Sequence, residues 1–393
     1  MTQAADRQVP ADATVRSLGI TRLGDLTGLD VIGLPVWMAT RPNSRSLCVS
    51  LGKGLTHEGA RLGAVMEAAE TAIAEAAEAV ISSYGSYAGL ADRTGDCLPL
   101  GSIFACRYEA FDPERERGWI EGRSWATGKA VLAPYELVGL DMRSDAPWDR
   151  NAFRISSIGL AAAFDLETAR LNALLEVIEN DAVAPFEEFG LCRGIYAPAS
   201  ADREGDDALG RALRLLVKAG VDPVFLDLTP DHGVPVAGCF VPRPASAEEG
   251  PGLAYSAGFA CRPDPDQALL AALLEAVQSR LGHIAGSRDD IEGIDYRPVS
   301  KPPVRGPAHD LAAFRKRPSA PSGPDSAATF RVLAAVLARA GILDVYVFDL
   351  PPAGEIRVAK VIAPGLRFAA PDGATTATPG MAEAVLRRLL EET

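Results

Sequence analysis

The stretch VSLGKGLTHEGARLGAVMEAAE (Val49–Glu70) sets a pattern that two later stretches repeat, SSIGLAAAFDLETARLNALLEVIE (Ser156–Glu179) and YSAGFACRPDPDQALLAALLEAVQ (Tyr255–Gln278). Each stretch begins with a short β-like run and a glycine, passes through a polar helix start, and ends in an Ala/Leu-rich helix. The expected helix starts are Thr56 with His57 and Glu58, then Asp165, then Asp264 or Asp266. The pattern predicts three strand–turn–helix units.

A second repeat joins a helix to a hairpin. The segments Arg211–Pro242 and Arg331–Pro364 each contain a helix pattern that stops at a glycine, Gly220 or Gly341, followed by two β-branched strands. Because both kinds of unit recur, we expect an α+β fold of duplicated strand–turn–helix and helix–hairpin units. The apolar/polar alternation of Ile103–Leu140 predicts a β-meander.

The domain organisation expected is simple. Residues 1–18 are interpreted as a variable N-terminal segment and residues 19–393 as one domain. Within this domain, residues 286–324 are rich in Pro, Ser and charge, which predicts a flexible surface loop. The end of the chain, Met381–Glu392, is predicted to be a helix.

Composition and charge exclude several classes of function. Hydrophobic residues make up 48% of the chain and charged residues 23%, as in ordinary globular proteins. The formal net charge of −13 repels nucleic acid and anionic membranes, so neither is an expected partner. Met1–Pro10 lacks the apolar core of a signal peptide, and the apolar stretches are too short to span a bilayer. We therefore expect a cytoplasmic protein.

Acidic pairs at helical spacing are the main candidate site. Glu67 with Glu70, and Glu176 with Glu179, are three residues apart, so each pair lies on one helix face. Four such carboxylates could bind Mg²⁺, which prefers oxygen ligands and leaves room for phosphate. The alternative is the solvated stripe of an amphipathic helix. The acidic pair recurs at matched positions of two repeats, with Glu275 and Gln278 in the third, which favours the metal site.

Phosphate binders are suggested by basic residues near these helices. Lys53 lies in the turn Gly52-Lys53-Gly54, and Arg280 and Arg288 follow the third acidic position. The alternative for both arginines is a helix C-terminal cation or a surface ion pair. Neither a P-loop nor a dinucleotide-binding glycine motif is found in the chain.

At these residues the chain resembles the YcaO family, and several blocks resemble the branch of that family associated with TfuA proteins. The resemblance covers about Leu18 to Arg367. Its blocks are the two ExxE helices, GITRLGDLTGLDVIGLPV (Gly19–Val36), RPNSRSLCVSLGKGL (Arg41–Leu55), LLEAVQSRLGHIAGSRDDI (Leu273–Ile291) and KVIAPGL (Lys360–Leu366).

The resemblance implies a YcaO-like domain over residues 19–393 and an enzyme that uses ATP and Mg²⁺ to activate a backbone amide of a peptide or protein. A nucleophile adds to the amide carbon, the amide oxygen is phosphorylated, and phosphate leaves. The enzyme then mainly positions groups and neutralises charge. External sulfide gives a thioamide, with a TfuA-like partner delivering the sulfur. A Cys, Ser or Thr side chain gives an azoline.

The family motifs map onto this chain with substitutions. The resemblance assigns the Mg²⁺ ligands to Glu67, Glu70, Glu176 and Glu179. It adds Asn172 to the cofactor-binding residues, beside Lys53, Arg280 and Arg288. The motif serines, one motif glutamate and both motif arginines are replaced, and the positions concerned are Gly63, Ala161, Thr168, Thr71 and Asn180. Neutral side chains at the arginine positions cannot make a charge-assisted contact.

The function expected is thioamide formation on a ribosomal peptide or protein, with a TfuA-like protein and a sulfide source. Three alternatives stay open: a catalytically impaired YcaO-like protein that binds a peptide or partner, an azoline-forming cyclodehydratase, and an accessory factor in ribosomal-protein methylthiolation. The Pro-rich C-terminal tail of azoline-forming members is not found in the sequence, which weighs against the second. The sequence assigns no catalytic residue and leaves the oligomeric state open, a homodimer included.

Overall fold

The computed structural model describes residues 10, 12–94, 97–103, 106–243, 255–290 and 308–367. The chain folds as two compact units built from interleaved segments. Unit 1 comprises Met1–Asn43, Leu47–Ala68 and Pro185–Ala320, and unit 2 comprises Ser44–Ser46, Ala69–Ala184 and Pro321–Thr393. Helix α2 (His57–Ala74) begins in unit 1 and ends in unit 2, whereas helix α6 (Leu166–Phe189) begins in unit 2 and ends in unit 1.

Unit 1 contains two sheets. The first is antiparallel, in the order β1 (Arg22–Asp25), β2 (Val36–Thr40), β3 (Val49–Lys53). The second is antiparallel except for its last pair, in the order β11 (Tyr255–Cys261), β10 (Val236–Pro242), β9 (Val224–Asp227), β8 (Gly194–Ala197), β12 (His309–Asp310). The helices of this unit, besides the first part of α2, are α1 (Asp12–Ser17), α7 (Ser200–Glu204), α8 (Ala208–Lys218), α9 (Pro265–Ala285) and α10 (Leu311–Arg315).

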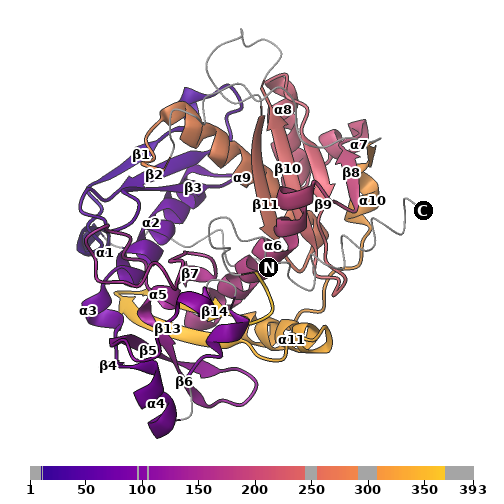
Figure 1. Ribbon diagram of the computed structural model, residues 1–393. Coiled ribbons are helices and arrows are strands. Elements are labelled where there is room, and N and C mark those ends of the chain that lie inside the picture. Colours follow the sequence, from indigo (N-terminus) through magenta and orange to yellow (C-terminus); the bar gives the residue numbers. More distant parts are fainter. Residues whose placement is uncertain are drawn as a thin grey trace. The chain divides into compact units, whose positions relative to one another are not determined.

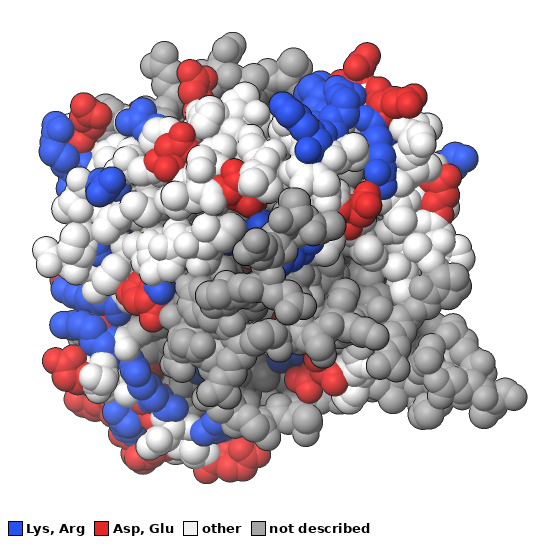
Figure 2. Space-filling view, turned by 90° about the horizontal axis from the view of Figure 1, so that it is seen from above, with Lys and Arg blue, Asp and Glu red and all other residues white. Residues whose placement is uncertain are grey.

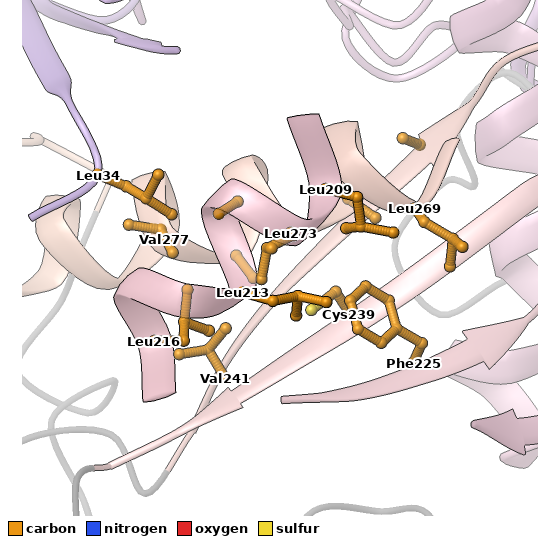
Figure 3. Packing of buried hydrophobic residues seen from close by; sticks show 14 of the residues in the cluster. Leu34, Leu209, Leu213, Leu216, Phe225, Cys239, Val241, Leu269, Leu273 and Val277 are labelled. Carbon is orange, nitrogen blue, oxygen red and sulfur yellow. The ribbon is translucent and has the colours of Figure 1, made fainter. Parts of the chain in front are cut away.

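Helix α9 organises the core of unit 1. It packs on strands β10 and β11 of the larger sheet and also contacts β3 of the smaller one (Figure 1). Figure 3 shows Leu269 and Leu273 of α9 beside Leu213 of α8 and Phe225 of β9. All four side chains are almost completely buried. Because such burial is the main driving force for folding, this cluster fixes how α9 lies on its sheet.

Unit 2 is built on one antiparallel sheet. Its strand order is β4–β5–β13–β14–β7, and β6 pairs with β5. Its strands are β4 (Ser83–Gly85), β5 (Arg117–Ser124), β6 (Ala130–Pro134), β7 (Leu160–Ala163), β13 (Tyr346–Ala353) and β14 (Ile356–Ile362). Its helices, besides α6, are α3 (Ala77–Val80), α4 (Tyr87–Thr94), α5 (Tyr135–Val138) and α11 (Ser326–Arg339). Among its described residues, Trp119, Tyr135, Phe330 and Phe348 are the largest completely buried aromatic side chains.

The three strand–turn–helix repeats are confirmed, as β3–α2, β7–α6 and β11–α9. Thr56 and Asp165 accept hydrogen bonds from backbone N–H groups three residues ahead, as predicted helix starts should. In the third repeat Asp264 caps the helix by accepting from Gln267 N at 3.0 Å. Asp266 lies inside that helix and contacts Arg315 instead.

The helix–hairpin repeats are also confirmed, as α8–β9–β10 and α11–β13–β14. Gly220 and Gly341 follow the two helices with φ of 70° and 93°, in the left-handed region that glycine adopts without strain. The predicted YcaO-like α+β class therefore describes the local architecture. The repeats do not indicate, however, that the repeated strands and helices are divided between two compact units.

Other segments differ from the expectation. The meander predicted for Ile103–Leu140 is only a hairpin of β5 and β6, because the described residues before Arg117 form short 3-10 turns. In residues 286–324, β12 and α10 replace part of the expected loop, and α10 buries Leu311 and Phe314. Residues 1–9, 291–307 and the predicted helix Met381–Glu392 lie outside the described residues. Among the helices that are described, none has the length and apolarity needed to cross a bilayer.

Candidate functional site

Glycines bring each acidic helix against its own strand. A β-carbon on Gly52 would lie 2.1 Å from the backbone N of Ala64, and one on Gly258 would lie 2.2 Å from the backbone N of Ala276. Gly159 occupies the matched position of the second repeat, where a β-carbon would lie 2.7 Å from the side chain of Val177. No larger residue fits such contacts, so glycine is what allows the close approach of strand and helix. This close packing fixes the position of each helix that carries an acidic pair.

In unit 1 the first and third repeats meet in a cluster of alternating charge. The Nζ atom of Lys53, at the end of β3, lies 2.9 Å from Oε2 of Glu275 on α9. Glu67 on α2 is half-buried. Burial raises the pKa of Glu67 to about 7, and nearby Glu275 adds to the rise, whereas Lys53, Arg288 and the Leu51 backbone oppose it. Burial thus disfavours the ionised form of Glu67 although two cations lie near it.

The two arginines predicted to bind phosphate are held differently. Arg288 lies near enough to Glu67 to affect its pKa, and it also forms a paired contact with Asp290, Nε to Oδ1 at 2.8 Å. Arg280 makes a two-bond ion pair with Asp30, at 2.8 and 3.0 Å, in which Asp30 is 3% exposed. This pair ties the loop before β2 to helix α9. Arg288 therefore lies near Glu67, whereas Arg280 forms a structural ion pair with Asp30.

In unit 2 the acidic side chains lie against strands β7 and β14. Oε1 of Glu70 accepts a hydrogen bond of 2.7 Å from the backbone N of Ala162, on the edge strand β7. Lys360 of β14 is completely buried, and its Nζ donates to the carbonyl of Ser156 at 2.6 Å. Burial lowers the pKa of Lys360, whereas the charge of Glu176 on α6 raises it, so the two groups are close.

The remaining predicted residues are partly or fully accessible. Glu176 and Glu179 are half-buried on α6, and Asn172 is exposed on the same helix. Thr71, at the position of the first motif arginine, is buried. Asn180, at the position of the second, has a buried Oδ1 atom without a hydrogen-bond partner among the described residues. An unsatisfied buried polar atom is uncommon in a folded protein.

The donor set suits a magnesium–nucleotide group, although the four carboxylates are divided between the units, with Glu67 in unit 1 and the other three in unit 2. Among the described residues, no three His, Cys, Asp or Glu side chains are arranged to hold a metal ion. The role of the four glutamates as Mg²⁺ ligands therefore remains a prediction. In its favour, Glu67 offers carboxylate oxygens of the kind that Mg²⁺ prefers, and Lys53 and Arg288 near it are cations suited to phosphate.

Sequence reasoning missed the buried cation Lys360, which lies near Glu176. It assigned the block KVIAPGL (Lys360–Leu366) to the resemblance but gave its lysine no role. A signal was present, because this lysine interrupts a run of apolar residues typical of a buried strand, IRVAKVI (Ile356–Ile362). The sequence could not show that this lysine donates to the carbonyl of Ser156 and lies near Glu176.

Comparison with known proteins agrees with these features. Residues 51–367 match the family described as "YcaO cyclodehydratase, ATP-ad Mg2+-binding". An uncharacterized protein encoded in the tfuA 3′ region of Rhizobium leguminosarum bv. trifolii is 35% identical over 364 residues, covering 90% of this chain and 84% of that protein.

Solved structures share the fold. The structure of YcaO from Methanopyrus kandleri bound with AMPPCP and Mg²⁺ is similar with a TM-score of 0.64 and 24% identity, covering 94% of this chain and 93% of that one. A heterocyclase in complex with substrate and cofactor gives a TM-score of 0.65 and 19% identity over 91% of this chain. The chain spans about half, 52%, of that heterocyclase. At these identities the likeness establishes the fold.

Proposed function

The chain belongs to the YcaO family of ATP-dependent, Mg²⁺-binding enzymes, and from this premise we propose that it converts a backbone amide of a ribosomal peptide or protein into a thioamide. In the proposed reaction a carbon–sulfur bond forms as sulfide adds to the amide carbon, and the carbon–oxygen bond breaks. The amide oxygen leaves as phosphate, and ADP is the second product. ATP supplies the phosphoryl group that makes this oxygen a leaving group, and Mg²⁺ neutralises its charge.

The residues have separate tasks in this proposal. Glu67, Glu70, Glu176 and Glu179 are the proposed Mg²⁺ ligands, and Lys53 and Arg288 are proposed to contact phosphate. The observation that carries this assignment is the unit 1 cluster, in which Glu67 lies near Lys53, Glu275 and Arg288 and has a pKa of about 7. A divalent cation would favour the ionised form of Glu67, which burial disfavours. Asn172 is exposed and able to reach a ligand, whereas Arg280 would first have to leave Asp30.

The partner and the sulfur chemistry are supported by the relative encoded in the tfuA 3′ region. We propose a TfuA-like protein as the partner that delivers sulfide, and a precursor peptide or protein as the substrate. We also propose a cytoplasmic location, because the reaction would use ATP and a ribosomal product. On the face shown in Figure 2, basic and acidic side chains of the described residues are interspersed.

The proposal is tested by mixing purified protein, TfuA-like partner, candidate peptide, sulfide, Mg²⁺ and ATP. We expect ADP to form and the peptide to gain the mass difference between oxygen and sulfur. Glu176→Gln should abolish both products, whereas Glu188→Gln, at an exposed position of the same helix, should retain them. ADP without any mass change would refute thioamide formation, and an azoline would instead appear as loss of water.

A second candidate is a YcaO-like protein that binds a peptide or partner without turnover. The neutral residues Thr71 and Asn180 favour it, because they cannot make the contacts of the motif arginines. Calorimetry with a non-hydrolysable ATP analogue separates the two candidates. Mg²⁺-dependent binding that Glu176→Gln removes supports the enzyme, and the failure of the wild-type protein to bind the analogue supports the binding protein.

A further inference from the structure

The ion pair between Lys53 and Glu275 joins the first repeat to the third within unit 1. The Nζ atom of Lys53, the last residue of β3, lies 2.9 Å from Oε2 of Glu275 on α9. The two side chains are 27% and 35% exposed, whereas Asp30, in its ion pair with Arg280, is 3% exposed. The Lys53–Glu275 pair is therefore accessible to a ligand, whereas the pair of Asp30 and Arg280 belongs to the packed interior.

Glycines fix the backbone at both ends of this accessible pair. Gly54 follows Lys53, and a β-carbon there would lie 2.8 Å from the backbone N of Ala60 on α2. On α9, the backbone carbonyl carbon of Glu275 would lie 2.7 Å from a β-carbon on Gly258 of β11. Only glycine allows strand and helix to approach so closely. Because α9 also packs on β3, the two charged side chains extend toward each other from fixed positions.

Glu67 is a second carboxylate near Lys53. Gly63 of α2 faces the Lys53 backbone, since a β-carbon on Gly63 would lie 3.6 Å from the backbone N of Lys53. Glu67 is four residues further along α2, so it projects from the same helix face one turn away. Burial is the main cause of the raised pKa of Glu67, but Lys53 opposes the rise and Glu275 adds to it, so both lie near. Of these two carboxylates, the ion pair of Lys53 is with Glu275.

Glu275 occupies the position in the third repeat that Glu67 and Glu176 occupy in the first two. Those two residues are proposed Mg²⁺ ligands, whereas Glu275 already binds an ammonium group of the protein itself. We infer that Glu275 is a positioning residue: it holds the Lys53 ammonium group, presents it to the phosphates of the nucleotide, and keeps it from pairing with Glu67. This inference rests on the proposed function, because it takes Lys53 as a phosphate contact.

The role has two physical reasons. Lysine has a flexible four-carbon side chain, and ordering such a chain when a ligand binds costs conformational entropy. Glu275 removes part of this cost beforehand, and its one bond leaves two of the three ammonium protons for phosphate oxygens. The second reason is competition. Without Glu275, the ammonium group of Lys53 can pair with Glu67, and that pairing opposes Mg²⁺ binding by the same carboxylate.

The test compares Glu275→Gln, Lys53→Met and the double variant with the wild-type protein. Glu204→Gln is the control, because it removes an exposed glutamate of the same unit. Binding of the non-hydrolysable ATP analogue with Mg²⁺ is measured by calorimetry once circular dichroism shows each variant folded. We expect Glu275→Gln to weaken binding about fivefold, the size expected when a long side chain must be ordered on binding, and Glu204→Gln to match the wild type. In the Lys53→Met background, Glu275→Gln should have no further effect, because it acts through Lys53.

The sign of the effect separates positioning from simple repulsion. If Glu275 only repelled the phosphates, removing its charge would tighten binding. Tighter or unchanged binding by Glu275→Gln would therefore overturn the positioning role and leave the proposed function intact. An equal loss with and without Lys53 would also overturn it, and failure of the wild-type protein to bind the analogue would overturn both proposals. If Glu275→Gln does not fold, Glu275→Ala, which places the best helix former on α9, decides by the same criteria.

Discussion

Replacing Glu67 by glutamine should change how the stability of the protein depends on pH. Burial raises the pKa of Glu67 from an ordinary 4.5 to about 7 in the folded protein. Between these two values the folded state keeps a proton that the unfolded state has lost. The free energy of unfolding therefore falls as the pH rises through this range, and the loss is complete above the folded pKa. Glutamine cannot ionise, so Glu67→Gln should lack this loss.

The size of the effect follows from the pKa difference. One pKa unit corresponds to about 1.4 kcal/mol, so a full shift from 4.5 to about 7 corresponds to roughly 3 kcal/mol. Glu67 keeps some contact with solvent, which reduces the effect. We expect the wild-type protein to lose about 1–2 kcal/mol relative to Glu67→Gln between about pH 5 and pH 8.

The assay is urea unfolding at both pH values in metal-free buffer, followed by circular dichroism. Glu188→Gln is the matched control, because it removes an exposed helical glutamate. The control should follow the pH dependence of the wild-type protein. Parallel pH dependence of the wild-type protein and Glu67→Gln would show that the carboxyl group is well solvated. The argument that Glu67 awaits a cation would then fail.

Three substitutions test the contacts that support the site. Gly258→Ala should cost about 2–4 kcal/mol of stability, because its β-carbon would lie 2.2 Å from the backbone N of Ala276. Arg280→Met should cost about 3 kcal/mol, because it leaves the buried carboxylate of Asp30 without its ion pair. Asp264→Ala should cost about 1 kcal/mol through loss of the helix cap. Urea unfolding measures all three changes.

Each of these variants has a control. Gly101→Ala adds a β-carbon with nothing within 4 Å and should change stability by less than about 0.5 kcal/mol. Asp30→Asn in the Arg280→Met background should recover part of the loss, because the uncompensated charge is removed. Asp266→Ala should cost less than Asp264→Ala, since it loses only a partly exposed contact with Arg315. A reversed order for the two aspartates would contradict the assignment of the cap.

Local structure was largely predictable because its signals are local. The glycines after α8 and α11 and the hydrophobic repeats of α2, α6 and α9 depend on residues close in sequence. The choice between Asp264 and Asp266 was not predictable, because both residues suit a helix start. Asp266 instead forms contacts with Arg315, and the sequence does not show that a residue about fifty positions away will fold back to it. For the same reason, helix α10 could not be predicted within a segment rich in proline and charged residues.

The site was predictable as residue types but not as contacts. The repeats identified Glu67 and Glu275 as equivalent positions, and Lys53 as a nearby cation. They could not show that Lys53 of the first repeat pairs with Glu275 of the third, since the two are 222 residues apart. Equivalent positions of a duplicated fold need not have equivalent tasks. Glu275 pairs with a lysine, whereas Glu67 in the same cluster has a pKa that burial raises.

The substituted motif positions lead to a wider conclusion about how function is inferred in this family. Both arginines of the acidic motifs are replaced in this chain, by Thr71 and Asn180. Judged by motif residues alone, the protein would be inactive. Charge acts through space, however, and the effect of a cation depends on distance and burial and not on its place in a motif. The completely buried Lys360 lies on a strand some 180 residues after Asn180, yet the charge of Glu176 raises its pKa. A relative with a neutral residue at this strand position and no motif arginines would lack both sources of charge. We expect such a relative to bind Mg²⁺ and nucleotide more weakly than this protein, and binding measured side by side would decide it.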